Sequence, residues 1–395
     1  MTSSMTLSPE QAARIADDAY EVSSAGISRA MQMSKGLSLK DTDGSGFQRP
    51  DERLMGQTGF LKKSAGFGFV AEGDGGSRKG QYLVAMRGTM GAKGVSRDWQ
   101  TNYCAYTKQS KGGHKVHGGF QSVFNDIEPD LKAYFKGKRG TVHCVGHSLG
   151  GALATLSADY LHEMGDFDIK LYTFGAPRVG LEDFCRNLTK KIKQENMFRM
   201  FHTTDPVPMI APYPYIHAPF TGMDRLNWGI RIEKPGRIVP DDHGMDLYVK
   251  TASKVATWGA LSANNMEAHT PWEVWLKDAA ASKINGVIQF GASVFDMISK
   301  CIQGIIKQVL SSVNSALLAG MNFIDQLAWL LYRGALASEK IAWYLKSLIQ
   351  VIFKFLGRSY QSGTSITHAF IRWVFDLLYS SVQILGKKAI QLVGH

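Results

Sequence analysis

The sequence predicts an α/β fold: a mainly parallel β-sheet with helices on both faces, followed by an all-α region. Short apolar runs alternate with helical segments over residues 141–203, which is typical of βαβ units. A strand, a tight turn and a helix meet around Gly146-His147-Ser148-Leu149-Gly150. Residues 285–395 contain no proline and repeat apolar residues at helical spacing, which predicts the all-α region.

The first helix is predicted to begin at Ser8-Pro9-Glu10 and to run to about Val22, because a cap residue, a proline and an acid follow one another there. Residues 26–66 are polar and glycine-rich, so we expect mostly loop or short helix. The remaining predictions are strands at Phe67–Ala71, Tyr82–Met86, Thr141–Val145, Ile169–Phe174 and Met197–Thr203, and helices at 149–164 and 181–192.

The turn at Ser148 fits G-x-S-x-G between a strand and a helix, the nucleophile-elbow pattern of α/β-hydrolases. Such a turn is so tight that a Cβ at Gly146, Gly150 or Gly151 would collide with the neighbouring strand or helix. It raises the serine hydroxyl above the sheet, and the free N–H groups of the following helix favour an oxyanion. We therefore predict that Ser148 is a catalytic nucleophile.

A nucleophilic serine needs a base, and the base needs an orienting carboxylate. In α/β-hydrolases these follow the serine in the order acid, then histidine. Asp205 comes directly after the strand Met197–Thr203, at the sheet edge where the elbow lies, and is the predicted acid. Asp166 and Asp168 precede a strand and should lie at the opposite edge.

Three histidines follow the predicted acid. His243 is the preferred base, because it comes after a further candidate strand at Ile230–Ile232 or Arg237–Val239. His269 is the competing candidate. His217 is close to the acid in the chain, and we expect a structural role for it.

Six segments, in order, resemble the class 3 lipase family, which includes the fungal triacylglycerol lipases, over about Ser8–Ala252. The resemblance implies an α/β-hydrolase fold, lipid-ester substrates, and an oxyanion hole formed by Thr89 and the backbone N–H of Leu149. The pattern His-x-Met-x-x-Tyr around His243 also resembles the histidine loop of that family. We expect no cofactor and no metal ion. The six segments are Val84–Thr89, Asp98–Asn102, Val116–Phe120, Gly146–Gly151, Thr173–Gly180 and Asp205–Pro208.

Two features depart from that family. Residues Met90–Arg97, where its lid usually lies, are small and glycine-containing. Either the lid is missing, or a segment from 258–275 or the C-terminal helices covers the site. The last part of the chain has no counterpart in the basic fold, so we predict a hydrolase domain at 1–282 and an amphipathic helical region at 283–395.

The predicted helical region is basic, with ten Lys or Arg against four Asp or Glu over residues 285–395. Lys346, Gln350, Lys354 and Arg358 fall every four residues along one helix face, with apolar residues on the other. Three interpretations stay open: a bundle packed on the hydrolase domain, a cationic membrane-binding region, or a surface for a protein partner. No window is apolar enough for a confident membrane span.

The formal net charge of +11 favours an anionic partner. Since no zinc-finger or RNA-binding signature accompanies it, we expect a membrane surface and not nucleic acid. The N-terminus has no Sec-type signal peptide, so we expect synthesis in the cytoplasm and export, if any, by a non-Sec route. This general build resembles the bacterial phospholipase effectors of type VI secretion, which implies secretion machinery or an inhibitor protein as partners.

The preferred hypothesis is a serine hydrolase that cleaves carboxylic esters of lipids, with membrane phospholipid favoured and an antibacterial role implied by the effector resemblance. The alternatives are a membrane-perturbing or partner-binding helical protein on a hydrolase scaffold, and a soluble carboxylesterase. A further motif, Asp41 to Gly46 with Glu52 at the twelfth position, approaches the spacing of an EF-hand calcium loop. Gln48 and Pro50 do not fit that loop, so a polar turn is preferred to a calcium site.

Overall fold

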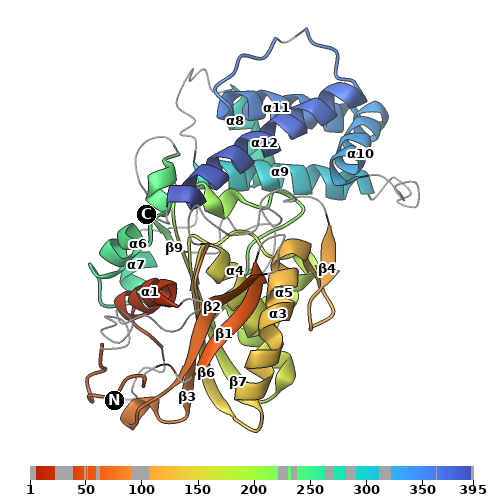
Figure 1. Ribbon diagram of the computed structural model, residues 1–395. Helices are drawn as coiled ribbons and strands as arrows, with labels where there is room; N and C mark the ends of the chain where they lie inside the picture. The colour runs from red at the N-terminus through yellow and green to blue at the C-terminus, as the bar shows by residue number, and fades with distance from the viewer. Residues whose placement is uncertain are drawn as a thin grey trace.

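The computed structural model describes residues 6–22, 39–48, 50, 52–58, 63–89, 106–220, 230–232, 238–262, 271–281, 291–310, 322–361 and 363–392. Its centre is a seven-stranded sheet in the order β1-β2-β3-β6-β7-β8-β9 (Figure 1). The first three strands pair antiparallel and the pairs from β3 onward are parallel, so the mainly parallel sheet is confirmed. The strands are β1 (Glu52–Thr58), β2 (Lys63–Glu72), β3 (Gln81–Met86), β6 (Gly140–His147), β7 (Phe167–Phe174), β8 (Met197–His202) and β9 (Ile230–Ile232).

Helices cover both faces of this sheet because its central strands are apolar on both sides. In β3, Val84 and Met86 join one core, and Leu83 and Ala85, which alternate with them, join the other. The first core is closed by α3 (Gly118–Phe135), α4 (Leu149–Met164) and α5 (Glu182–Ile192). The second is closed by α1 (Pro9–Asp18), α6 (Met245–Ala252) and α7 (Trp258–Ser262).

Several elements differ from the sequence predictions. The edge strand β1 lies where loop or short helix was expected, and β2 begins at Lys63, before the predicted Phe67. The polar composition of β1 is tolerated because it pairs with only one neighbour in the sheet and buries Leu54. Helix α3 was not predicted, although its buried residues recur three or four positions apart: Phe120, Phe124, Ile127, Leu131 and Phe135. A short hairpin of β4 (Thr107–Gln109) and β5 (Lys115–His117) precedes α3.

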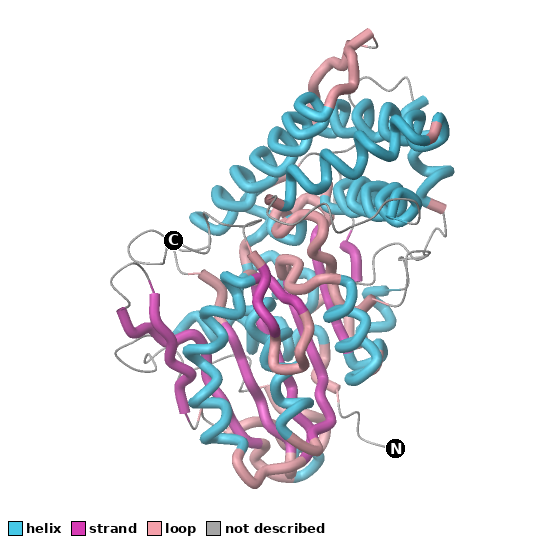
Figure 2. Tube along the Cα trace, turned by 90° about the vertical axis from the view of Figure 1, so that its right-hand side faces the viewer, coloured by secondary structure: helices cyan, strands magenta, loops and turns pink. Residues whose placement is uncertain are grey.

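The C-terminal helices gather at one end of the sheet (Figures 1 and 2) and share a further hydrophobic core, to which Phe201 of β8 and Met209 also contribute. This core includes Leu276 of α8, which precedes the predicted domain boundary at 282/283. Within the described residues, no helix is long and apolar enough to cross a membrane. The helices are α8 (Trp272–Ala281), α9 (Ala292–Leu310), α10 (Phe323–Ala337), α11 (Glu339–Phe355) and α12 (His368–Leu392).

The helical region packs on the carboxyl ends of the parallel strands. Helix α12 contacts two short helical turns, η5 (Val207–Met209) and η6 (Pro240–His243), and α9 also contacts η5. The approach is close: a Cβ added to Gly386 of α12 would lie 2.2 Å from Ile210 Cδ1. Of the three interpretations of this region, the structure contains the packed bundle.

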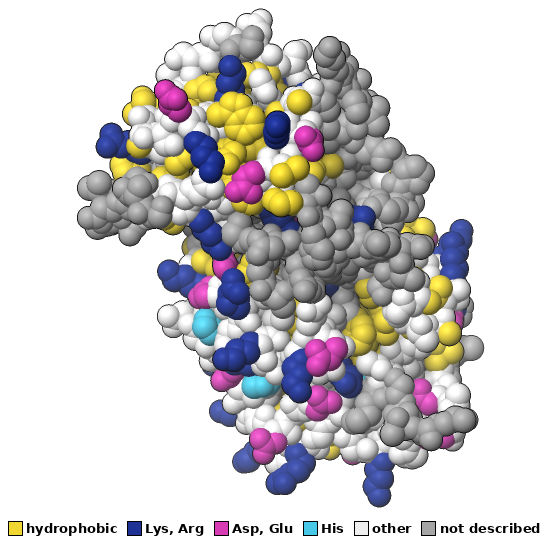
Figure 3. All heavy atoms as spheres, turned by 180° about the vertical axis from the view of Figure 1, so that it is seen from behind, with side chains coloured by type: hydrophobic (Ala, Val, Ile, Leu, Met, Phe, Trp, Pro, Cys, Tyr) yellow, Lys and Arg dark blue, Asp and Glu magenta, His cyan; other side chains and the backbone are white. Residues whose placement is uncertain are grey.

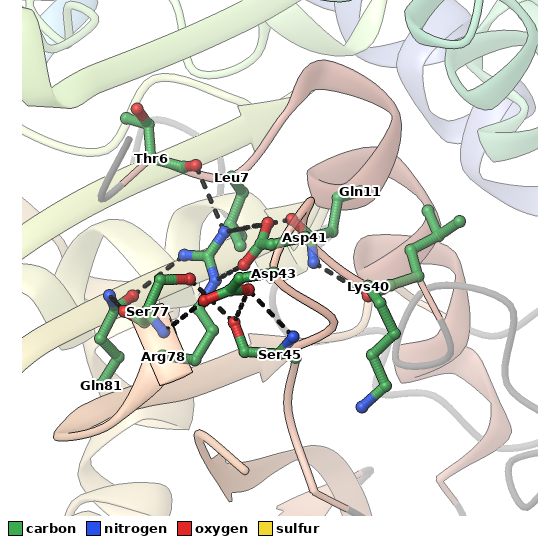
Figure 4. A network of polar contacts seen from close by, with 12 residues as sticks. Thr6, Leu7, Gln11, Lys40, Asp41, Asp43, Ser45, Ser77, Arg78 and Gln81 are labelled. Atoms are coloured by element: carbon green, nitrogen blue, oxygen red, sulfur yellow. Dashed lines mark hydrogen bonds and ion pairs between the residues drawn. The ribbon is translucent and has the colours of Figure 1, made fainter. Parts of the chain in front are cut away.

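The acidic motif near the N-terminus forms a polar turn (Figure 4). Both oxygens of Asp41 accept hydrogen bonds from the buried guanidinium of Arg78, at 2.5 and 2.9 Å. Asp43 accepts from Ser45 and from the Ser77 backbone N–H, and these bonds, chiefly those from Ser45, lower the pKa of Asp43. The carboxylates therefore satisfy protein donors in this turn. In the part of the chain that the structure describes, no group of three or more His, Cys, Asp or Glu side chains could hold a metal ion.

Candidate active site

The elbow has the backbone geometry that the sequence predicts. Ser148 joins β6 to α4 with φ 56° and ψ −130°, in a region that non-glycine residues rarely occupy. A Cβ on Gly146 would lie 2.2 Å from the Gly150 carbonyl oxygen, and one on Gly150 would lie 2.1 Å from that of Met86. Glycine is thus required where the helix passes over its own strand and the end of β3.

The structure brings the three predicted catalytic residues into one hydrogen-bonded chain. His243 Nε2 lies 2.8 Å from Ser148 Oγ, and His243 Nδ1 lies 2.9 Å from Asp205 Oδ2. All three side chains are at most 2% exposed. Asp205 follows β8, and His243 ends η6, after the candidate strand that forms β9. A carboxylate at Nδ1 favours a proton on that nitrogen, which leaves Nε2 free to accept the serine proton.

Asp205 is held by two further donors. The Tyr248 hydroxyl donates to Oδ2 at 2.6 Å, and the Val207 N–H donates to Oδ1 at 2.8 Å. Burial, followed by the negative charge of Asp205, raises the pKa of Tyr248, so this phenol stays protonated as a donor. Tyr248 is the tyrosine of the His-x-Met-x-x-Tyr pattern, and its contact with Asp205 was not predicted from the sequence.

A second histidine positions the predicted base. The ring of His147 stacks on that of His243 with centroids 4.5 Å apart, and its Nε2–H donates to the His243 carbonyl oxygen at 2.9 Å. The Tyr20 hydroxyl, from the N-terminal segment, donates to His147 Nδ1 at 2.6 Å. Burial is the main cause that lowers the pKa of His147 well below its usual value. A neutral ring suits one donor and one acceptor role, so His147 is a positioning residue that the sequence did not reveal.

The predicted oxyanion-hole residues lie beside the nucleophile. Leu149 is the first residue of α4, and helix geometry leaves its N–H without an intrahelical acceptor. A Cβ on Gly88 would lie 2.9 Å from Ser148 Cβ, so the backbone leading into Thr89 touches the elbow. Thr89 is 4% exposed, and its hydroxyl has no hydrogen-bond partner among the described residues. A buried, unpaired donor here suits a negatively charged oxygen.

Several predictions lie outside the described residues: the competing base His269, the segment Asp98–Asn102 and the lid candidate Met90–Arg97. His217 donates its Nε2–H to the Pro208 carbonyl at 2.8 Å, which fits the structural role expected for it. Of the alternative covers, α7 packs on a face of the sheet, where Trp258 donates to the Leu7 carbonyl. Helix α12 lies against the two turns next to the predicted acid and base.

Acid pH should destabilise this protein through its buried histidines. Burial is the main cause that lowers the pKa of His143, His147 and His217 below 6.5. Below that pH the unfolded chain binds protons that the native state does not. The free energy of unfolding should then fall by up to about 1.4 kcal/mol per pH unit for each histidine. Urea unfolding at pH 7.5, 6.5 and 5.5 measures this, and His143→Gln should remove about one third of the slope. A stability that is constant down to pH 5.5 would contradict the prediction.

Comparison with known proteins identifies a family for part of this chain. The family described as lipase (class 3) matches residues 83–214, which include Thr89, the elbow and Asp205. Residues 83–214 belong to the class 3 lipase family. The match ends before β9 and His243, so the predicted base and the helical region lie beyond it.

Class 3 lipase relatives match only part of this chain. A secreted mono- and diacylglycerol lipase 1 of Fusarium solani is 36% identical over 33% of this chain and 40% of its own length. Phospholipase A1-II 4 of Oryza sativa subsp. japonica is 27% identical over 45% of this chain and 43% of its own length. The chain thus spans less than half the length of these relatives. The solved structure of Lip2 lipase from Yarrowia lipolytica is 24% identical, with a TM-score of 0.37, and covers 53% of this chain and 75% of the lipase.

Proposed function

We propose that this protein is a serine hydrolase that cleaves carboxylic esters of lipids. The observation that carries the proposal is the hydrogen-bonded chain Ser148–His243–Asp205, built on a strained elbow inside a class 3 lipase region. The chain supplies a nucleophile, a base and an orienting carboxylate in one buried line, which is the arrangement that acyl transfer to serine requires.

In the proposed reaction, Ser148 Oγ attacks the ester carbonyl carbon while its proton passes to His243 Nε2. The carbonyl oxygen becomes an oxyanion and accepts hydrogen bonds from the Leu149 N–H and from Thr89. His243 then gives the proton to the departing alcohol, and an acyl group remains on Ser148. His243 then takes a proton from water as the water oxygen attacks the acyl carbon. The bond between this carbon and Ser148 Oγ breaks, the fatty acid leaves, and His243 returns the proton to Oγ.

We further propose membrane phospholipid as the substrate. The rice relative is named a phospholipase A1, whereas the Fusarium relative is named a mono- and diacylglycerol lipase. The basic helical region favours the first class. Hydrophobic side chains gather on it among Lys and Arg side chains (Figure 3), and Trp343 and Trp373 are 45% and 47% exposed. Exposed tryptophans next to cations suit the headgroup layer of an anionic bilayer.

Fatty-acid release from phosphatidylethanolamine/phosphatidylglycerol vesicles tests this proposal, with Ser148→Ala as the blank. Release by the wild type alone supports a phospholipase. Release only from mono- or diacylglycerol emulsions would support lipase activity and contradict phospholipid as the substrate. Turnover restricted to short, monomeric esters would favour a soluble carboxylesterase instead.

The alternative function, membrane perturbation by the helices, separates from hydrolysis by dye leakage from the same vesicles. Leakage caused equally by Ser148→Ala and the wild type would favour the helices as the active part. Leakage that needs Ser148 would favour hydrolysis. Export by a non-Sec route and an antibacterial role extend this proposal, and growth of a bacterium that expresses the wild type or Ser148→Ala in its periplasm would test the toxicity.

A further inference from the structure

A small cavity lies between the helical region and the lipase core, which is the seven-stranded sheet with the helices that cover it, and none of the three catalytic residues lines this cavity. It has a volume of about 60 Å³, which is room for about four water molecules. One wall comes from the core, through β8 and the segments after β7 and η5, and the other comes from α9. The residues that line the cavity include Arg178, Arg199, His217, Asp296, Ser299 and Lys300.

The cavity is lined by more positive than negative charge. Arg178 and Arg199 are 2% and 4% exposed, and Lys300 adds a third cation. Asp296 is the one carboxylate among the described lining residues. It forms an ion pair with Arg178, whose Nη1 also donates to two backbone carbonyls, so that guanidinium is well satisfied. His217 adds no charge, because burial lowers its pKa well below neutrality.

Arg199 is the lining guanidinium whose hydrogen-bond donors are left without acceptors among the described residues. Its Nη2 lies 4.0 Å from Asp296 Oδ2, beyond hydrogen-bond distance. Its Nε and Nη1 are buried and have no hydrogen-bond partner among the described residues. These two nitrogens carry three of the five N–H donors of a guanidinium. Burial lowers the pKa of Arg199 to about 10, so it still carries its charge at neutral pH. A buried cation with three unpaired donors is costly unless an acceptor is bound.

We propose that this cavity is a binding site for a phosphate-type oxyanion held by Arg199. An anion in this cavity balances the excess positive charge of Arg199 and Lys300, and a small rotation of the Arg199 guanidinium would bring its unpaired N–H groups to the anion. A tetrahedral oxyanion has the size of a few water molecules and suits the cavity volume. Because α9 supplies Asp296, Ser299 and Lys300, the bound anion connects the helical region to the lipase core. The same chemistry has two sources, a free phosphate and the phosphate of a lipid headgroup.

Calorimetric titration of the full chain with inorganic phosphate, against sodium chloride at matched ionic strength, tests the proposal. We expect saturable binding of one phosphate. Arg199→Gln should weaken it at least about tenfold, since a charged hydrogen-bond donor is lost. Lys300→Glu, on the rim formed by α9, should also weaken it about tenfold. Lys132→Glu, the same charge change on the exposed face of α3, should leave binding unchanged.

Lys300→Glu keeps the test decisive if the buried Arg199→Gln chain does not fold. Absence of phosphate binding to the wild type would overturn the proposal and leave water as the occupant. Equal binding by Lys300→Glu and Lys132→Glu would overturn it as well, because the phosphate would then bind elsewhere.

The source of the phosphate is tested in the Ser148→Ala chain, so that hydrolysis does not enter the measurement. Dihexanoyl-phosphatidylglycerol, kept below its critical micelle concentration, is titrated with and without inorganic phosphate. Competition between the two supports a lipid headgroup site, and binding of inorganic phosphate alone supports a free phosphate. The proposed phosphate site is independent of the proposed hydrolysis. If the wild type binds phosphate but hydrolyses no ester, the proposed function is wrong and the phosphate site is still supported.

Discussion

Ser148→Ala is expected to lower kcat for a soluble p-nitrophenyl ester by about 10⁶, because the hydrogen-bonded triad of Ser148, His243 and Asp205 then lacks its nucleophile. Removal of Oγ leaves His243 and Asp205 paired at 2.9 Å and does not alter the elbow glycines. The residual rate should reflect the oxyanion donors and substrate binding alone. Steady-state kinetics measures the effect, with circular dichroism to show that the variant is folded.

Two graded variants distinguish a triad from a lone serine. Asp205→Asn should lower kcat by about 10⁴, because an amide can donate to His243 Nδ1 and select the wrong tautomer. Tyr248→Phe should cost only about tenfold, since Asp205 keeps its bonds from His243 and the Val207 N–H. Wild-type kcat in either Ser148→Ala or Asp205→Asn would refute the assignment.

Much of the sheet and the site could be predicted because their signals are local. The strand, turn and helix around Ser148 lie within a short stretch of chain, and Asp205 follows directly on a strand of the same sheet. The choice between His243 and His269 is not local, since it depends on which side chain reaches the serine across the fold. The structure places His243 there.

The contacts that the sequence did not predict join distant parts of the chain. Tyr20 reaches His147 across 127 positions, and Arg178 pairs with Asp296 across 118. Neither pair has a periodic or motif signal, because each depends on how the finished elements pack. The edge strand β1 was missed for a related reason: its pairing with β2, and not its own polar sequence, makes it a strand.

Asp296→Ala is expected to lower the free energy of unfolding by about 3–5 kcal/mol, because it leaves a buried cation without its counter-charge. Arg178 and Asp296 are 2% and 8% exposed, and Arg178 also lies over the Phe295 ring at 4.8 Å. Urea unfolding, followed by circular dichroism, measures the loss. The control is Arg372→Ala, which breaks the more exposed pairs with Asp325 and Asp376 and should cost less than about 1 kcal/mol.

The double variant Arg178→Met/Asp296→Leu distinguishes two origins of that loss. If the loss comes from the unpaired guanidinium, removing both charges should recover most of the stability, since an apolar pair of similar size can replace a buried ion pair. If the loss comes from a disrupted junction between α9 and the lipase core, the double variant should be as unstable as Asp296→Ala.

Inorganic phosphate should stabilise Asp296→Ala more than the wild type if an oxyanion binds beside Arg199, because two guanidinium groups at the cavity then lack a carboxylate partner. Equal stabilisation of both chains would argue against such a site.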